Sequence, residues 1–212
     1  PEAEAIVLDT ERERQGTATW EDATASSIHP RMALWRGDIT RLEVDVIVNA
    51  ANSALLGCRA PGNTCIDNAI HSASGLELRQ ACAEVMAERA RGDGPSVFPT
   101  GEALLTPGFH LPSRFVIHTV GPIVSVELTD EHREALARSY RRCLEEAAAH
   151  GLNTVAFCCI STGVFGFPQE EAARIAVTTV TDFLESEAPG ASELCVIFDV
   201  FGDHDEALYR AL

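Results

Sequence analysis

The chain has 212 residues, 46% of which are hydrophobic, and a formal net charge of −16. This composition supports the buried core of one large domain, or of a domain with an extension, and no apolar run approaches the roughly 20 residues of a membrane span. Binding of nucleic acid needs a basic face that neutralises phosphates, so direct nucleic-acid binding is not expected from so acidic a chain.

All 16 basic residues are arginine, and the chain has no lysine. The absence of lysine excludes catalysis through a lysine Schiff base and phosphate binding by the lysine of an ordinary P-loop. Backbone N–H groups and helix ends are therefore the groups that we expect to bind a phosphate.

Residues 1–30 are rich in Glu, Arg, Thr and Ala, and their only apolar cluster is residues 6–8. We expect them to form a loosely packed amino-terminal extension, followed by one domain over residues 31–212. The beginning of the chain lacks the charged-then-apolar pattern of a secretory signal, which indicates a soluble, cytoplasmic protein.

Beyond residue 30, short apolar runs alternate with amphipathic segments. The apolar runs predict strands at residues 32–35, 42–49, 102–106, 115–119, 154–160 and 194–201. Apolar residues at helical spacing predict helices at residues 65–92, with an interruption at Gly75, at 130–150 and 168–184, and after Asp203. Strands that alternate with helices predict an α/β domain whose sheet is covered on both faces.

The segment STGVFGFP, residues 161–168, follows a buried strand and ends with a proline that suits the first turn of a helix. Such a loop presents unpaired backbone N–H groups at the positive end of a helix, which makes an anion site without a basic side chain. The alternative is an ordinary turn between a strand and a helix.

Four polar side chains lie where predicted strands end or a predicted helix begins. Asp38 can accept a hydrogen bond from an exocyclic amine such as that of adenine, or it can cap a turn. Asn49 and Asn52 can bind sugar hydroxyls or the local backbone. Asp67 lies in the first turn of a helix, where it can stabilise the helix or deprotonate a water molecule in a pocket.

Together, the segments GDIT, NAAN, IDNAIH, HTVGP and STGVFGFP resemble the macrodomain family over residues 34–212. The resemblance implies a three-layer α/β/α sandwich around a mixed sheet of roughly six strands, and a site for ADP-ribose. The insertion LLGCRAPGNTCIDNAIH narrows the resemblance to the zinc-dependent macrodomains of microbes, which resemble the ADP-ribosyl hydrolase branch.

The resemblance also implies a role for each residue of the site. Asp67 and Asn52 would be catalytic. Asp38 and Ile39 would bind adenine, and Phe201 would stack near it. The diphosphate would be bound by the loop of Ser161, Thr162, Gly163, Val164 and Phe165. Asn49 and Asn52 would face the distal ribose. The ring of Phe165 would also pack against that ribose. His71 and His118 lie on apolar stretches and are interpreted as core histidines with satisfied hydrogen bonds.

The expected metal is Zn²⁺, bound by Cys58 and Cys65. The resemblance to the zinc branch implies the pattern Cys–x4–His–x–Cys at these positions, whereas this chain has Asn63 in the place of the histidine. An amide oxygen is a poor zinc ligand compared with imidazole. Three explanations stay open, namely loss of the metal, a substitution introduced at this position, or recruitment of His71 or His110. Alternatively, the two cysteines form a disulfide or are free thiols.

The predicted function is removal of mono-ADP-ribose from modified proteins by cleavage at the distal ribose. The expected partners are ADP-ribose or an ADP-ribosylated protein, with neither nucleic acid nor membrane. One alternative is a reader module that binds ADP-ribose and catalyses nothing. The other is a deacetylase of O-acetyl-ADP-ribose, which the same pocket would accommodate.

Overall fold

The computed structural model describes residues 2–58, 65–92 and 97–212. The strands are β1 (Thr24–Ala25), β2 (Met32–Arg36), β3 (Val46–Ala50), β4 (Ala103–Pro107), β5 (Phe115–Thr119), β6 (Thr154–Phe157) and β7 (Cys195–Val200). The α-helices are α1 (Glu2–Gln15), α2 (Ile66–Ser74), α3 (Leu76–Arg91), α4 (Asp130–Ala149), α5 (Gln169–Leu184) and α6 (Asp203–Ala211), and the 3₁₀ helices are η1 (Trp20–Asp22) and η2 (Ile39–Arg41).

The strands form one mixed sheet in the order β1-β2-β7-β6-β3-β5-β4. The edge pairs β1·β2 and β4·β5 are antiparallel, and the pairs between them are parallel. The predicted α/β fold with a mixed sheet is confirmed. The sheet has seven strands rather than about six, because the two-residue strand β1 adds an edge from the segment expected to be an extension.

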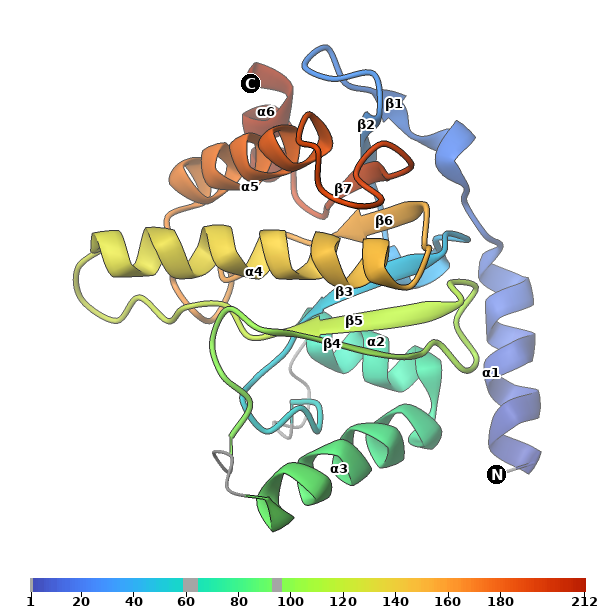
Figure 1. Cartoon of the computed structure of the whole chain (residues 1–212). Helices are drawn as coiled ribbons and strands as arrows, with labels where there is room; N and C mark the ends of the chain where they lie inside the picture. The colour runs from blue at the N-terminus through green and yellow to red at the C-terminus, as the bar shows by residue number, and fades with distance from the viewer. Residues whose placement is uncertain (1, 59–64, 93–96) are drawn as a thin grey trace.

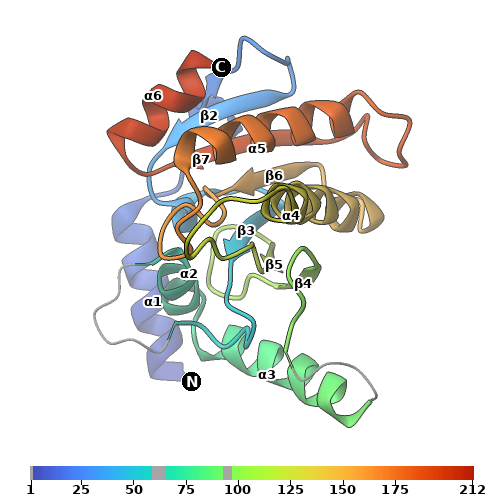
Figure 2. The same ribbon diagram turned by 90° about the vertical axis from the view of Figure 1, so that its left-hand side faces the viewer.

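The central strands are buried because helices cover both faces of the sheet. In β3, Val46, Ile47 and Val48 have no exposed surface, as their continuously apolar sequence predicts. Each such side chain stabilises the fold by roughly 1.5–3 kcal/mol when it leaves water. Figures 1 and 2 show α4 and α5 on one side of the sheet and α1 and α2 on the other, which gives the three layers.

The break between α2 and α3 falls at Gly75, as predicted. The φ angle of Gly75 is 89°, in the left-handed region that favours glycine. This turn lets α2 pack on β3 while α3 runs beside β4, and it leaves the first turn of α2 at the carboxyl end of β3.

Helix α1 lies against the domain rather than apart from it (Figure 1). The Nη1 of Arg12 donates a hydrogen bond of 2.8 Å to the carbonyl oxygen of His110. The backbone N–H of Leu76 donates to Oε1 of Glu4 at 3.2 Å. These contacts place the first helix against the loop before β5 and the start of α3.

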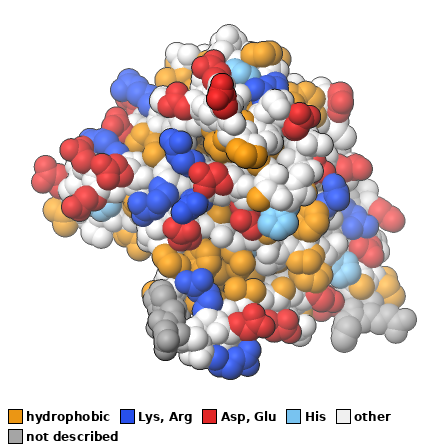
Figure 3. All heavy atoms as spheres, viewed as in Figure 1, with side chains coloured by type: hydrophobic (Ala, Val, Ile, Leu, Met, Phe, Trp, Pro, Cys, Tyr) orange, Lys and Arg blue, Asp and Glu red, His pale blue; other side chains and the backbone are white. Residues whose placement is uncertain are grey.

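Arginine and acidic side chains are interspersed on the face shown in Figure 3. Two of the arginines of α4 are paired with carboxylates: Arg133 Nε lies 2.8 Å from Oε1 of Glu171, and Arg142 Nη1 lies 2.8 Å from Oε2 of Glu145. Exposed pairs of this kind add little stability, but they neutralise the local positive charge. Within the described residues, every helix is too short or too polar to cross a lipid bilayer.

Candidate functional site

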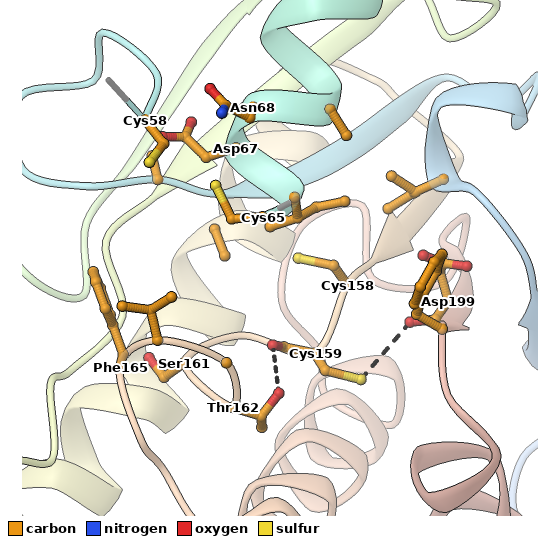
Figure 4. Close-up of a pocket in the computed structure, with 18 of the residues that line it drawn as sticks. Cys58, Cys65, Asp67, Asn68, Cys158, Cys159, Ser161, Thr162, Phe165 and Asp199 are labelled. Carbon is orange, nitrogen blue, oxygen red and sulfur yellow. Dashed lines mark hydrogen bonds between the residues drawn. The ribbon is translucent and has the colours of Figure 1, made fainter. Parts of the chain in front are cut away.

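A cavity of about 780 Å³ opens at the carboxyl edge of the parallel strands, where the loops after β2, β3, β6 and β7 meet. This is the usual place for a ligand in an α/β sheet. Figure 4 shows Asp67 at one end, Asp199 at the other, and Ser161, Thr162 and Phe165 along a third side. Predicted site residues that line it are Asp38, Ile39, Asn52, Cys58, Cys65, Asp67, Ser161, Thr162, Gly163, Val164, Phe165 and Phe201.

Asp67 is the buried carboxyl group at one end of the cavity, with 4% of its surface exposed. Its Oδ1 accepts a hydrogen bond from Nδ2 of Asn49 at 2.8 Å, and its Oδ2 accepts one from Nδ2 of Asn52 at 3.1 Å. Burial raises the pKa of Asp67, while the two amides and the charge of Arg79 act in the opposite direction. The carboxyl group is therefore held in one orientation, with a pKa moved toward the range useful for general-base catalysis.

Asn49 lies behind Asp67 and does not line the cavity, in contrast to the expectation that it faces a ribose. It is completely buried, and it stands beside His118 in the register of β3 and β5. One N–H of its amide is directed at Asp67, and Nδ2 also lies 3.1 Å from Nδ1 of His118. The geometry gives Asn49 a positioning contact with Asp67 instead of a place on the cavity wall.

Asn52 lines the cavity but uses its amide within the protein. Its Nδ2 donates to the carbonyl oxygen of Gly57 at 3.1 Å and to Asp67, and its Oδ1 accepts from the N–H of Ala54 at 2.9 Å. The side chain therefore fixes the loop after β3 and the carboxyl group of Asp67 at the same time.

A chain of hydrogen bonds behind the site was not predicted from the sequence. Nδ1 of His118 accepts from Asn49, so the ring proton is on Nε2, which lies 2.9 Å from Oγ1 of Thr106. Burial lowers the pKa of His118 to about 3, and the ring is neutral. The interpretation of His118 as a satisfied core histidine agrees with these contacts.

His71 differs from that interpretation. Both of its ring nitrogens are buried and have no hydrogen-bond partner among the described residues. Its Nε2 lies 3.6 Å from Oδ1 of Asp67, one helical turn away on α2. Burial lowers the pKa of His71 to about 4, so a neutral ring packs against the carboxyl group.

The loop after β6 has the geometry of an anion site. Ser161 and Gly166 have φ angles of 66° and 68°, which turn the chain sharply before α5 begins. The hydrogen bonds found among the described residues use none of the backbone N–H groups of residues 162–165. These donors are available to a ligand, as the sequence predicted for a nest of N–H groups at a helix end.

A glycine on the neighbouring loop allows this conformation. A Cβ atom at Gly121 would clash with Oγ of Ser161 and Cγ2 of Ile160, so the loop would have to shift. The backbone N–H of Val124 also donates to the carbonyl oxygen of Phe165 at 2.8 Å. The loop after β5 therefore supports residues 161–166 from the side.

Asp38 lies near Asp199, away from Asp67, and the structure shows the capping role that its sequence allowed. Its Oδ1 caps η2 by accepting from the N–H of Thr40 at 3.0 Å and from its Oγ1 at 2.7 Å. Its Oδ2 makes no hydrogen bond with the described residues. Phe201 also lines the cavity, and 82% of its surface is exposed.

Eleven lining residues were not singled out from the sequence. Six of them stand inside the segments GDIT, NAAN and IDNAIH, which were the available signal, whereas the other five belong to none of the recognised segments. The missed residues are Gly37, Ala50, Ala51, Ile66, Asn68, Ala69, Ser72, Cys158, Cys159, Asp199 and Asp205.

The thiols of Cys58 and Cys65 lie beside Asp67 at the cavity (Figure 4). Burial raises the pKa of the Cys65 thiol, and the neighbouring Cys58 thiol raises it further. Thiol donors suit zinc, but catalytic zinc typically takes three protein ligands. Two are found here, and Asn63 lies outside the described residues. Within the described part of the chain, the donor set beside Asp67 therefore holds two of the three ligands that zinc typically takes.

The two histidines considered as replacement ligands are directed elsewhere. His71 groups instead with Cys82 and His118, whose ligand atoms all lie within 4.8 Å of one another. Nδ1 of His110 lies 3.3 Å from Oδ1 of Asp9 on α1. Within residues 2–58, 65–92 and 97–212, neither histidine forms a three-ligand group with Cys58 and Cys65.

Comparison with known proteins agrees with the fold and the cavity. The sequence model of the Macro domain family matches residues 48–176. The chain is 51% identical over 179 residues to a protein-ADP-ribose hydrolase of Treponema medium, covering 84% of this chain and 66% of that protein. It is 48% identical over 178 residues to a protein-ADP-ribose hydrolase of Staphylococcus aureus (strain MSSA476), covering 84% and 64%. The chain therefore spans less than two thirds of the length of these relatives.

Two solved structures resemble this one closely in backbone. The Oceanobacillus iheyensis macrodomain with ADP has a TM-score of 0.73 and 41% identity, covering 85% of this chain and 88% of that one. The Trypanosoma brucei macrodomain in complex with ADP-ribose has a TM-score of 0.74 and 36% identity, covering 92% and 76%. The chain belongs to the Macro domain family.

Proposed function

We propose that this protein is a protein-ADP-ribose hydrolase, which binds the ADP-ribose group in the cavity and cleaves its bond to a modified side chain at the distal ribose. The observation that carries this proposal is one cavity that contains both a loop of unused N–H donors and the buried carboxyl group of Asp67. The names of the relatives in T. medium and S. aureus and the ADP-ribose complex of the T. brucei macrodomain support it.

In this proposal the ligand extends from Asp38 to Asp67. Oδ2 of Asp38 and the N–H of Ile39 bind adenine, and Phe201 covers its face at the mouth. The N–H groups of residues 162–165 bind the diphosphate, which fixes the distal ribose between Phe165 and Asp67. Binding energy from the diphosphate then positions the anomeric carbon for reaction.

Asp67 acts as the general base of the proposed hydrolysis. Its carboxylate takes a proton from a water molecule as the water oxygen forms a bond to the anomeric carbon. The bond to the modified side chain breaks, its electron pair stays on the departing atom, and that atom takes up a proton. Asn49 and Asn52 hold the carboxylate in place through their hydrogen bonds of 2.8 and 3.1 Å.

We extend the proposal to zinc bound through Cys58 and Cys65, as in the zinc-dependent branch that the insertion resembles. A bound zinc ion supplies a Lewis acid. The adjacent thiols beside Asp67 support this extension. The described residues provide only two ligands there. The step proposed for Asp67, Asn49 and Asn52 is therefore written without a metal ion.

A second function, a reader that binds ADP-ribose without cleaving it, is favoured by the asparagine at position 63. Release of ADP-ribose from a mono-ADP-ribosylated protein, measured with and without a chelator, separates the candidates. Release that the chelator abolishes supports a zinc-dependent hydrolase, and release that survives it supports a hydrolase that works without metal. Calorimetric binding of ADP-ribose with no release supports the reader.

A further inference from the structure

Asp199 is a buried carboxyl group in the cavity that the proposed binding mode leaves unused. It lies near the end of β7, opposite Trp35 in the register with β2, and only 6% of its surface is exposed. Its carboxyl group accepts a hydrogen bond from the backbone N–H of Gly37, the residue before Asp38. Its Oδ1 is buried and has no hydrogen-bond partner among the described residues.

The groups around Asp199 disfavour its ionised form. The carboxyl group of Asp38 and the thiols of Cys158 and Cys159 face it, with Asp205 close to Cys159. Burial and the charge of Asp38 raise the pKa of Asp199 well above its ordinary value. A protonated carboxyl group offers one O–H donor and one acceptor side by side.

We propose that Asp199 is a specificity residue that reads adenine through two hydrogen bonds, accepting from the exocyclic amine N6 and donating to the ring nitrogen N7. This inference rests on the proposed function, since it requires an adenine nucleotide in the cavity. The pattern is the one that an asparagine or glutamine side chain forms with the same edge of adenine. A six-oxo purine such as hypoxanthine places a carbonyl oxygen where the amine should be, so it loses the first bond.

Asp38 and Asp199 have complementary roles in this arrangement. The exocyclic amine of adenine carries two hydrogens, and Oδ2 of Asp38 is available for one of them, because only Oδ1 is used by Thr40. Asp199 accepts a hydrogen bond from the other hydrogen of the amine. A purely structural role for Asp199, holding Gly37, leaves Oδ1 buried without a partner, which is rare in native proteins and is typical of functional sites.

Two substitutions at this position separate recognition from packing. Asp199→Asn keeps a donor and an acceptor in nearly the same volume, and Asp199→Leu keeps the volume but removes both. Asp182→Asn, on the exposed surface of α5, is the control for the change in net charge. Calorimetry would measure the affinity of each 212-residue protein for ADP-ribose and for its hypoxanthine analogue, with thermal melting to confirm that each variant is folded.

We expect Asp199→Asn and Asp182→Asn to bind ADP-ribose within threefold of the wild type. Asp199→Leu should bind about 10-fold to 100-fold more weakly and should lose most of its preference for adenine over hypoxanthine. As the pH rises and Asp199 ionises, the affinity of the wild type should fall, whereas that of Asp199→Asn should stay constant.

The inference is overturned if Asp199→Leu binds both nucleotides as the wild type does, or if Asp199→Asn is as weak as Asp199→Leu. These results would leave the proposed function standing. If the wild-type protein binds neither nucleotide, the proposed function itself is wrong.

Discussion

Replacing Asp67 by asparagine tests the central chemical claim with a minimal change in shape. The new amide has one oxygen acceptor where the carboxylate has two, so one of the bonds from Asn49 and Asn52 is lost. A net hydrogen bond contributes about 1 kcal/mol, which corresponds to a shift of about 2–4 °C in melting temperature for a chain of this size. The fold should therefore remain intact.

The effect on turnover should be much larger than the effect on stability. Loss of a general base typically lowers the rate about 10²-fold to 10⁴-fold, or roughly 3–5 kcal/mol of transition-state stabilisation. Release of ADP-ribose from a modified protein should fall by that factor. The affinity for free ADP-ribose should change by less than about fivefold, because the proposed binding mode places Asp67 away from the adenine and the diphosphate.

The pH dependence of the wild type gives an independent check. The pKa of Asp67 is raised and the base acts in its ionised form, so the rate should increase as the pH rises through this pKa. The free energy of unfolding should depend on pH in the opposite direction. In the window between the ordinary and the raised pKa, the unfolded chain has lost the proton that the folded protein keeps. Stability therefore falls as the pH rises through this window. A variant Asp67→Asn that turns over within threefold of the wild type would refute the assignment of the base.

Four further results are expected. Asp38→Ala should weaken ADP-ribose binding at least about 10-fold in calorimetry and lower the melting temperature by only about 2–4 °C, since the cap of η2 is lost, and an unchanged affinity would contradict the adenine assignment. Asn63→His should raise the zinc content measured by elemental analysis, and equal metal in both proteins would show that position 63 plays no part in coordination. Gly121→Ala should destabilise the fold by about 1–3 kcal/mol and weaken ADP-ribose binding, because its Cβ meets Ser161, whereas normal melting and affinity would show that the anion loop adapts. Deletion of residues 1–15 should leave ADP-ribose affinity within about twofold if the binding unit is residues 31–212, and a larger loss would place part of that unit in α1.

Patterns in the sequence were sufficient to predict about half of the residues that line the cavity. Asp38 and the loop from Ser161 to Phe165 follow apolar runs, and the carboxyl ends of parallel strands necessarily meet at one edge of the sheet. Asp67 was recognisable from its place in the first turn of a helix. The helix break at Gly75 was also visible, because glycine interrupts a periodic apolar face.

The remaining features depend on strand register and long-range packing, which a single sequence does not encode locally. Asn49 is turned away from the cavity because β3 pairs with β5 so that Asn49 stands beside His118. Thr106 meets His118 only through the antiparallel pairing of β4 with β5. The place of Asp199 depends in the same way on the register of β7 with β2.

None of the described side chains that line the cavity carries a positive charge, so phosphate would be bound by neutral dipoles inside a protein of net charge −16. At long range an anionic nucleotide is repelled, and salt screens that repulsion over a Debye length of about 10 Å at 0.1 M. Association should therefore become faster as ionic strength rises, the reverse of a site built from arginines. Once bound, the phosphates would be held by short-range contacts that salt hardly weakens.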